Sequence, residues 1–267
     1  GRTSMDPHSI DPARHYPIQK TDQYIRDRCY ESAQKVYTPA VHPREPFARS
    51  RGLRTSPFYE REVALGGYFM EVAGWERAHG YAANEEALLA KYRDRIPTRQ
   101  AEWDNRHFWE VSNAEQLAMS DGVGMINLSH FAIFDVEGPD AEGLMEYLSV
   151  AKVGTDTALG KGVYTHFLDH AGGIRSDLTI IRLASDCYRV VCGGDTGHRD
   201  YIWMRDIKDK HGFPNVTFHD QSEQLATLGL WGPDARSTLA QLMDDPESIY
   251  NASFPFATTR EINVCGV

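Results

Sequence analysis

The sequence lacks the features of a membrane, secreted or nucleic-acid-binding protein. None of its uninterrupted apolar runs approaches the ~18–20 residues of a membrane-spanning helix. Its N-terminus has no charged segment followed by an apolar one, which is the pattern of a secretory signal. Acidic residues outnumber basic ones, 38 to 28, and the net charge is −10, which argues against nucleic acid or an anionic membrane as the main partner. Any anionic ligand would have to be met by local arginine or lysine side chains.

Cysteine is also sparse. The 267 residues contain four, none in Cys-x-x-Cys spacing: Cys29, Cys187, Cys192 and Cys265. This usage fits a reducing compartment and buried free thiols. Asn-x-Ser/Thr triplets begin at Asn127, Asn215 and Asn251, but without a signal peptide we do not expect glycosylation. We therefore expect a cytoplasmic protein, or one of the mitochondrial matrix if the source is eukaryotic.

Several familiar site motifs are missing. No Gly-x-Gly-x-x-Gly fingerprint, Walker loop or Gly-x-Ser-x-Gly elbow occurs, so we expect no dinucleotide, nucleotide triphosphate or serine-nucleophile site within this chain. His166 and His170 have the spacing of a zinc pair on a helix. The flanking glycines favour a strand and a turn instead, where two such residues stand ~13 Å apart. We predict no metal site.

The sequence has an ordinary globular composition, 41% hydrophobic and 25% charged, and its length is enough for one large or two small domains.

The first ~18 residues have the composition of coil. Residues 39–57, rich in proline and arginine, have no apolar period and indicate an extended connector. It is either a solvated strap or a segment whose arginines dock onto another domain. The patterns predict helices over 22–37 (capped by Thr21), 113–119, 139–148 and 198–210, and strands over 124–128, 132–137, 178–183 and 188–192, the last two a hairpin.

One pattern occurs twice. Phe134 to Ala141 and Leu228 to Ala235 each contain a strand-like run followed by Gly-Pro-Asp-Ala and an amphipathic helix. Two such units about one hundred residues apart indicate duplicated parts of an α+β fold. Chance similarity of a common turn is the alternative.

Two short segments are candidates for a site. In Gly172-Gly173-Ile174-Arg175-Ser176-Asp177 a tight glycine turn places an acid at the mouth of a strand, where Asp177 is either a general base or a solvated turn residue. In Gly74-Trp75-Glu76-Arg77 an aromatic ring stands beside an acid and a guanidinium. That segment is either an ion pair shielded by tryptophan or a ligand cradle or interdomain clamp. The neighbours Ser129 and His130 do not have the geometry of a catalytic pair.

Together these segments resemble one superfamily in their order along the chain. They are Gly74-Trp75-Glu76-Arg77, Asn127-Leu128-Ser129-His130-Phe131, Val136-Glu137-Gly138-Pro139-Asp140-Ala141, Gly172-Gly173-Ile174-x-x-Asp177-Leu178-Thr179 and Leu230-x-Gly232-Pro233. The chain is similar to the folate-binding region of the dimethylglycine and sarcosine dehydrogenases and oxidases, which is related to the aminomethyltransferase of the glycine cleavage system. Residues 11–57 look like the tail that joins the flavin domain of those enzymes to the folate domain.

The resemblance implies an aminomethyltransferase-like α+β fold, with residues 1–60 as the linker or tail of an upstream flavin domain and 61–267 as the first part of a tetrahydrofolate-binding domain. It implies that FAD in the upstream domain oxidises a small methylated amine and that the one-carbon unit passes to tetrahydrofolate. Asp177 would be the catalytic residue, facing the reactive folate nitrogens as a base or as an electrostatic anchor for the developing ammonium. Phe131, Tyr164, Thr179, Trp75 and Arg77 would bind the cofactor.

The sequence departs from the family at three places. Ala78-His79-Gly80-Tyr81 follows the Trp-Glu-Arg segment where the family often has Pro or Ala, then Asn and Trp. Leu168-Asp169-His170-Ala171 stands where it usually has Leu-Asn. The family's Arg-x-x-Tyr-x-Gly-Glu-x-Gly stretch, with a pterin-binding glutamate, is not found, nor is the flavin fingerprint. We therefore expect a fragment of a larger polypeptide. The alternatives are a stand-alone folate-dependent demethylase or aminomethyltransferase, and a non-catalytic interaction module of the same fold.

Overall fold

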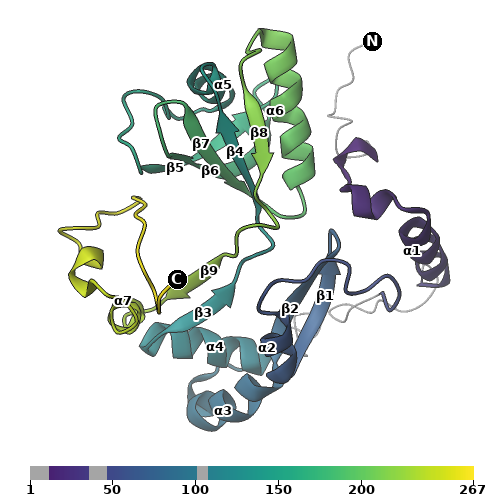
Figure 1. Ribbon diagram of the computed structural model, residues 1–267. Coiled ribbons are helices and arrows are strands. Elements are labelled where there is room, and N and C mark those ends of the chain that lie inside the picture. Colours follow the sequence, from purple (N-terminus) through teal and green to yellow (C-terminus); the bar gives the residue numbers. More distant parts are fainter. Residues whose placement is uncertain (1–11, 36–46, 101–107) are drawn as a thin grey trace. The chain divides into compact units, whose positions relative to one another are not determined.

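The computed structural model describes residues 12–35, 47–100 and 108–267 (Figure 1). Contacts within the chain divide it into two compact units. The sheet unit comprises Ser129–Thr227 and Leu239–Val267, together with the segment up to Tyr16. The hairpin unit comprises Pro17–Leu128 and Leu228–Thr238.

The sheet unit is built on five antiparallel strands in the order β5-β6-β7-β4-β8. The strands are β5 (Gly162–Leu168), β6 (Ile174–Arg182), β7 (Cys187–Cys192), β4 (Ala132–Glu137) and β8 (Thr217–Asp220), and its main helices are α5 (Ala141–Leu148) and α6 (Gly197–His211). Alternate strand residues, such as Leu178, Ile180 and Val190, form one core with Leu144 of α5 and Met204 of α6. The helices therefore cover one face of the sheet, and the other set of alternate side chains forms the opposite face.

The hairpin unit contains two antiparallel strand pairs and several helices. Its elements are α1 (Asp22–Lys35), α2 (Tyr59–Ala64), β1 (Gly67–Val72), β2 (Trp75–Tyr81), α3 (Ala82–Tyr92), α4 (Trp109–Asp121), β3 (Gly124–Asn127) and β9 (Leu228–Trp231); α7 (Ala235–Ala240) crosses the boundary between the units. β1 pairs with β2, and β3 pairs with β9 across one hundred residues of sequence. Leu89 and Tyr92 of α3 pack with Ala114 of α4 in a small core.

Most predicted elements are present, with shifted ends. Thr21 caps α1 as predicted, because its hydroxyl accepts the backbone N–H of Tyr24 at 3.3 Å. The strand predicted over 132–137 has those bounds, and the predicted hairpin is β6 and β7. α5 begins two residues later than predicted, since Pro139 and Asp140 form the preceding turn. Short 3₁₀ helices, Pro12–Arg14 and Pro17–Lys20, occupy part of the predicted N-terminal coil.

The repeated Gly-Pro-Asp-Ala pattern forms the same turn twice. Gly138 and Gly232 both have left-handed φ angles, +131° and +115°. In each turn the carbonyl of the glycine accepts the N–H of the alanine, at 2.9 Å in the first and 3.1 Å in the second. A Cβ on either glycine would lie within 2.2 Å of another segment's carbonyl oxygen. Both predicted strand–turn–helix units are therefore present, and their turns share one backbone geometry.

In the ranges that the structure covers, no helix combines the length and the apolar character required to cross a membrane.

Candidate functional site

The glycine turn that precedes Asp177 joins β5 to β6 and is organised by Asp169. The Asp169 carboxylate accepts the backbone N–H groups of Ala171 and Gly173, both at 2.8 Å. The Gly173 and Ala171 hydrogen bonds lower the pKa of Asp169. Gly172 supplies the left-handed φ of +85° that the turn requires. The family departure at 168–171 therefore has a local role, because the aspartate holds the turn closed.

Asp177 lies inside a strand, which corrects the expectation that it stands between the turn and a strand beginning at Leu178. β6 begins at Ile174, four residues before Leu178. These four residues were missed because Arg175, Ser176 and Asp177 are polar, whereas the continuous apolar run starts at Leu178. Alternation along β6 buries Ser176 and Leu178 against the helices and leaves Asp177 exposed on the opposite face.

The strand register brings together three of the predicted site residues. Tyr164 pairs with Thr179, and His166 pairs with Asp177, across β5 and β6. The Tyr164 hydroxyl donates a hydrogen bond to Oδ2 of Asp177 at 3.1 Å. This hydrogen bond raises the pKa of Tyr164. The Tyr164 side chain is 63% exposed, so the carboxylate and the hydroxyl together form an open, polar patch.

Phe131, the fourth residue predicted here, lies in the loop before β4. β7 separates β4 from β6, and Ala132, Cys192 and Leu178 are paired in one row. Extending that row by one residue places Phe131 level with Asp177, about 10 Å away across two strand spacings. Gly194 allows this approach, because a Cβ there would lie 1.7 Å from the carbonyl oxygen of His130.

Residues that sequence reasoning missed lie on the same face. His166 was considered only as a metal ligand, yet it stands opposite Asp177, and its ring packs edge-on 5.5 Å from that of Tyr164. Arg189 forms a two-pronged ion pair with Asp135, both N–O distances 2.8 Å. The Asp135 hydrogen bond raises the pKa of Arg189. Strand alternation alone could have found this set, since all lie on the face opposite the helices.

A buried carboxylate fixes β6 from the helix side. Asp200 of α6 is 2% exposed and accepts hydrogen bonds from the hydroxyls of Ser176 at 2.8 Å and Thr196 at 3.2 Å. Burial raises the pKa of Asp200, although Arg199 opposes the shift. Since Ser176 immediately precedes Asp177, this network sets the position of the exposed carboxylate.

The other two predicted residues, Trp75 and Arg77, lie on β2 of the hairpin unit. Trp75 is 5% exposed, and the Arg54 guanidinium stacks 4.3 Å above its ring. Arg77 is half-buried and has no ion-pair partner among the residues that the structure describes. Glu76 does form an ion pair, but its partner is Arg51, because consecutive strand residues point to opposite faces.

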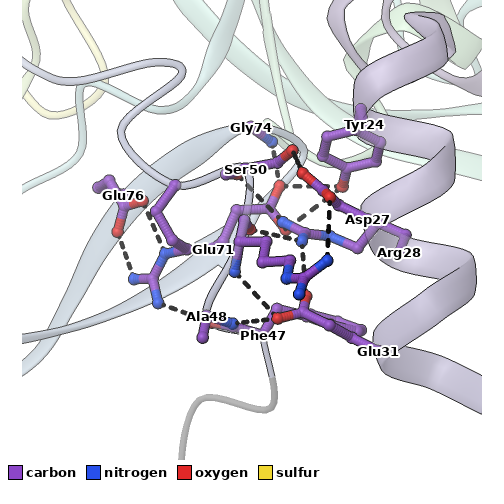
Figure 2. A network of polar contacts seen from close by, with 12 residues as sticks. Tyr24, Asp27, Arg28, Glu31, Phe47, Ala48, Ser50, Glu71, Gly74 and Glu76 are labelled. Atoms are coloured by element: carbon purple, nitrogen blue, oxygen red, sulfur yellow. Dashed lines mark hydrogen bonds and ion pairs between the residues drawn. The ribbon is translucent and has the colours of Figure 1, made fainter. Parts of the chain in front are cut away.

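That ion pair belongs to a polar network joining the connector to α1 and the β1–β2 hairpin (Figure 2). Arg51 donates to Glu76 at 2.8 Å through Nε, and the N–H of Gly52 donates to the same carboxylate at 2.7 Å. Burial raises the pKa of Glu76, but these hydrogen bonds outweigh it and the net shift is downward. Arg28 bridges Glu71 at 3.1 Å and Glu31 at 3.3 Å.

The arginines of the connector are therefore engaged by their own unit. Glu31 accepts the backbone N–H groups of Ala48 and Arg49, at 2.9 and 3.0 Å. Arg54 extends the hairpin as a bridge partner of Trp75. The contacts hold the connector against its own unit, so it is not a solvated strap, and they do not test the expected docking onto another domain; Arg44 lies outside the described residues.

The five-stranded sheet with two helices on one face, the strand pairs of the hairpin unit and the repeated turn define an α+β protein. On the sheet face opposite the helices Tyr164 and Asp177 are exposed, whereas Ile133 and Asp135 are buried. Comparison with known proteins agrees. Residues 58–267 match the family described as GCVT N-terminal domain, and residues 1–56 match FAD dependent oxidoreductase central domain. The chain belongs to the GCVT N-terminal domain family.

Curated relatives extend the match to the whole chain. Mitochondrial sarcosine dehydrogenase of Mus musculus is 28% identical over 295 residues, covering 100% of this chain and 31% of the relative. The 4-methylaminobutanoate oxidase (formaldehyde-forming) of Paenarthrobacter nicotinovorans is 30% identical over 243 residues, covering 91% of this chain and 28% of the relative. The chain thus spans about a third of the length of these relatives. The resemblance to the sarcosine dehydrogenase group is confirmed.

A solved structure supports the fold. The glycine cleavage system aminomethyltransferase T from Bartonella henselae has a TM-score of 0.54 and 23% identity, covering 71% of this chain and 44% of that one. The predicted aminomethyltransferase-like α+β fold is confirmed.

Proposed function

We propose that this chain is the folate-binding portion of a flavin-dependent N-methyl amine dehydrogenase or oxidase and that it passes a one-carbon unit to tetrahydrofolate. The observation that carries the proposal is the exposed Asp177 carboxylate held by the Tyr164 hydroxyl on an open sheet face. The relatives' names support a small methylated amine as substrate, and the match of residues 1–56 supports an FAD domain in the larger polypeptide. In this assignment residues 1–60 are the linker or tail of the flavin domain and 61–267 the first part of the folate domain.

The residues of the open face fit a reduced pterin. It is flat and carries nitrogens that need charge and hydrogen-bond partners. Asp177 offers a carboxylate, Thr179 a hydroxyl, and Tyr164 an exposed aromatic ring, all on adjacent strands. Phe131 adds a second ring at the level of Asp177.

When bound, tetrahydrofolate supplies amine nitrogens that accept a one-carbon unit. In the proposed mechanism Asp177 takes a proton from the reacting nitrogen, or holds its positive charge, as a general base or electrostatic anchor. Tyr164 fixes Oδ2 by its hydrogen bond and keeps the other oxygen directed to the ligand. Thr179 and Phe131 line the ring.

The hairpin unit contributes two further assignments. Arg77 has no ion-pair partner among the described residues, so its guanidinium would meet an anionic part of the folate, as the net charge of −10 requires of some local cation. Trp75, packed beneath Arg54, would support that strand as part of the cofactor site. The mouse relative is named as a mitochondrial protein. If the source of this chain is eukaryotic, we therefore propose the mitochondrial matrix as its location.

Calorimetric titration with tetrahydrofolate tests the site. Asp177→Asn should keep measurable binding of tetrahydrofolate. In the longer polypeptide that carries the flavin domain, the same substitution should lower the rate of one-carbon transfer at least ~10²-fold, the usual loss for a general base. Asp156→Asn is the matched control, because Asp156 is an exposed carboxylate of the same unit. Absence of heat with the unsubstituted protein would favour the interaction module instead.

The flavin assignment has its own test. The absorbance spectrum and intact mass of the full gene product should show a flavin on a much longer chain. A folate-binding protein without flavin would leave the stand-alone transferase as the function.

A further inference from the structure

His166 has no role in the function proposed above, yet it stands beside the central residue of the site. His166 of β5 is paired in register with Asp177 of β6. Directly opposed residues of two antiparallel strands project from the same face, with their Cβ atoms about 5 Å apart. A ligand that lies on the Asp177 carboxylate therefore also meets the imidazole ring.

The imidazole ring is held in place, but its nitrogens are open to a ligand. The ring is half-buried and packs edge-on against that of Tyr164, with 5.5 Å between the ring centres. The outer side of the strand is anchored as well, because the backbone carbonyl of His166 accepts the N–H of Val150 at 3.1 Å. Neither ring nitrogen has a hydrogen-bond or ion-pair partner in the part of the chain that the structure describes. A neutral imidazole can accept a proton on one of these nitrogens.

Other titratable side chains of this sheet face are already engaged. The Tyr164 hydroxyl donates to Asp177, and this hydrogen bond raises the pKa of the phenol. Arg189 forms an ion pair with Asp135, and that hydrogen bond raises its pKa, so the guanidinium remains protonated. His219 lies on β8, at the far edge of the sheet. The imidazole opposite Asp177 is not engaged in this way, and imidazole is the side-chain group that most readily exchanges a proton near neutral pH.

The proposed reaction has two protons to transfer. Two-electron oxidation of an N-methyl amine gives an iminium ion. Its carbon forms one bond to each of two folate nitrogens, the bonds to the amine nitrogen break, and both N–H protons pass to that nitrogen, which leaves as an ammonium ion. Atoms and charge balance without a further reactant. Since one carboxylate holds one proton at a time, two proton acceptors side by side match two nitrogens that one carbon must join.

We propose that His166 is a second catalytic residue of this site, which accepts the proton of one folate nitrogen while Asp177 accepts that of the other. Both residues then return their protons to the leaving amine. This inference rests on the proposed function and adds a residue to the same site.

NMR of the histidine ring C–H groups in the full chain gives a readout that does not depend on activity. Tetrahydrofolate should shift the His166 resonances, which His166→Gln identifies by their loss, and should leave those of His219 in place. Calorimetry of His166→Gln should show folate binding weakened by less than about fivefold, the effect of one hydrogen bond, because glutamine remains a hydrogen-bonding side chain but cannot take up the proton.

Rates of one-carbon transfer by the full gene product test the proton transfer itself. His166→Gln should lower kcat about 10²-fold, within the usual range for a lost acid–base group. His219→Gln is the matched control and should leave kcat unchanged, since this imidazole lies 3.4 Å from Glu137 at the far edge of the same sheet. Added imidazole should restore part of the rate of His166→Ala and none of that of Asp177→Asn.

Three outcomes would overturn the inference while the proposed function stands. His166 resonances that do not move, although calorimetry shows binding, would place the ring outside the site. An unchanged kcat in His166→Gln beside a slow Asp177→Asn would mean that Asp177 transfers both protons. A loss in His166→Ala that imidazole does not repair would mean that the ring only supports the structure. If the unsubstituted chain binds no tetrahydrofolate, this inference and the proposed function both fail.

Discussion

Tyr164 on β5 reaches diagonally across the sheet and donates a hydrogen bond to Asp177 on β6, although Asp177 is paired in register with His166. Diagonal neighbours on one face of a sheet are within reach of long aromatic side chains. The relationship gives the exposed carboxylate a fixed orientation without burying it. Asp200 holds the preceding residue, Ser176, from the other side of the sheet, so the strand is fixed on both faces.

Removing the Tyr164 hydroxyl should lower one-carbon transfer without unfolding the protein. Because the ring is 63% exposed, we expect Tyr164→Phe to change the free energy of unfolding by less than about 0.5 kcal/mol, as for most exposed substitutions. Transfer to tetrahydrofolate by the full gene product should fall about tenfold, since one orienting hydrogen bond is lost. Denaturant titration and steady-state rates measure the two effects. An unchanged rate would mean that Tyr164 does not orient Asp177 for the reaction.

The same hydrogen bond predicts a titration. The pKa of Tyr164 is raised above 10.0 because its hydroxyl donates to Asp177, so the phenol should ionise at higher pH than a free tyrosine. In Asp177→Asn the negative charge is gone and the pKa should move back down. Since the folded pKa exceeds the unfolded one, this group's stabilisation is present below pH 10 and is lost as the pH rises through the folded pKa. NMR of the labelled tyrosine ring measures the pKa of Tyr164 in the unsubstituted protein and in Asp177→Asn. Identical titrations in the two proteins would contradict the hydrogen bond between Tyr164 and Asp177.

The sequence was informative wherever apolar residues alternate or a turn has a fixed chemistry. The strand over residues 132–137 was predicted with its bounds, and the two Gly-Pro-Asp-Ala segments were found as a repeated pattern, although the helix after the first one begins two residues later than predicted. The start of β6 was not predicted, since Arg175, Ser176 and Asp177 are polar and the strand is specified by its pairing with β5.

The sequence also did not show which charged residues form ion pairs or hydrogen bonds with one another. Glu76 is adjacent to Arg77 in the sequence, but alternation directs them to opposite faces and Arg51, 25 residues away, takes the ion pair. Likewise Asp177 gave no sign of Tyr164 as its partner. The family resemblance supplied the candidate residues, and only the register showed which of them lie together.

The buried Arg51–Glu76 pair should stabilise the hairpin unit. The Glu76 side chain is 2% exposed and that of Arg51 27%. Replacing Glu76 with glutamine removes the carboxylate charge of this pair, and we expect a loss of about 2 kcal/mol, below the usual value for fully buried pairs because Arg51 is partly solvated. Urea denaturation followed by tryptophan fluorescence measures it. Arg26→Gln is the control, since Arg26 and Asp22 are exposed and 3.9 Å apart, and its effect should stay below about 0.5 kcal/mol.

The pH dependence of stability gives this pair a separate signature. Burial opposes ionisation of Glu76, but the Arg51 and Gly52 hydrogen bonds bring its net pKa below the ordinary 4.5. A carboxylate with a lowered folded pKa contributes stability above its unfolded pKa and loses it as the pH falls through the folded value. Stability should therefore decline below pH 4.5 more steeply in the unsubstituted protein than in Glu76→Gln. Parallel curves would show that Glu76 is not ionised in the folded state.

The repeated turn can be tested with two glycines that share a left-handed φ but differ in their surroundings. Gly138 has φ +131°, and a Cβ there would lie 2.1 Å from the carbonyl oxygen of Asn215; Gly172 has φ +85° and no atom within 4 Å. Gly172→Ala should cost about 1 kcal/mol, the conformational strain alone. Gly138→Ala should cost at least about 3 kcal/mol, because a backbone segment must also move. If thermal unfolding shows equal losses for the two variants, the contact with residue 215 does not require a glycine at position 138. The glycine would then be required only for its left-handed φ.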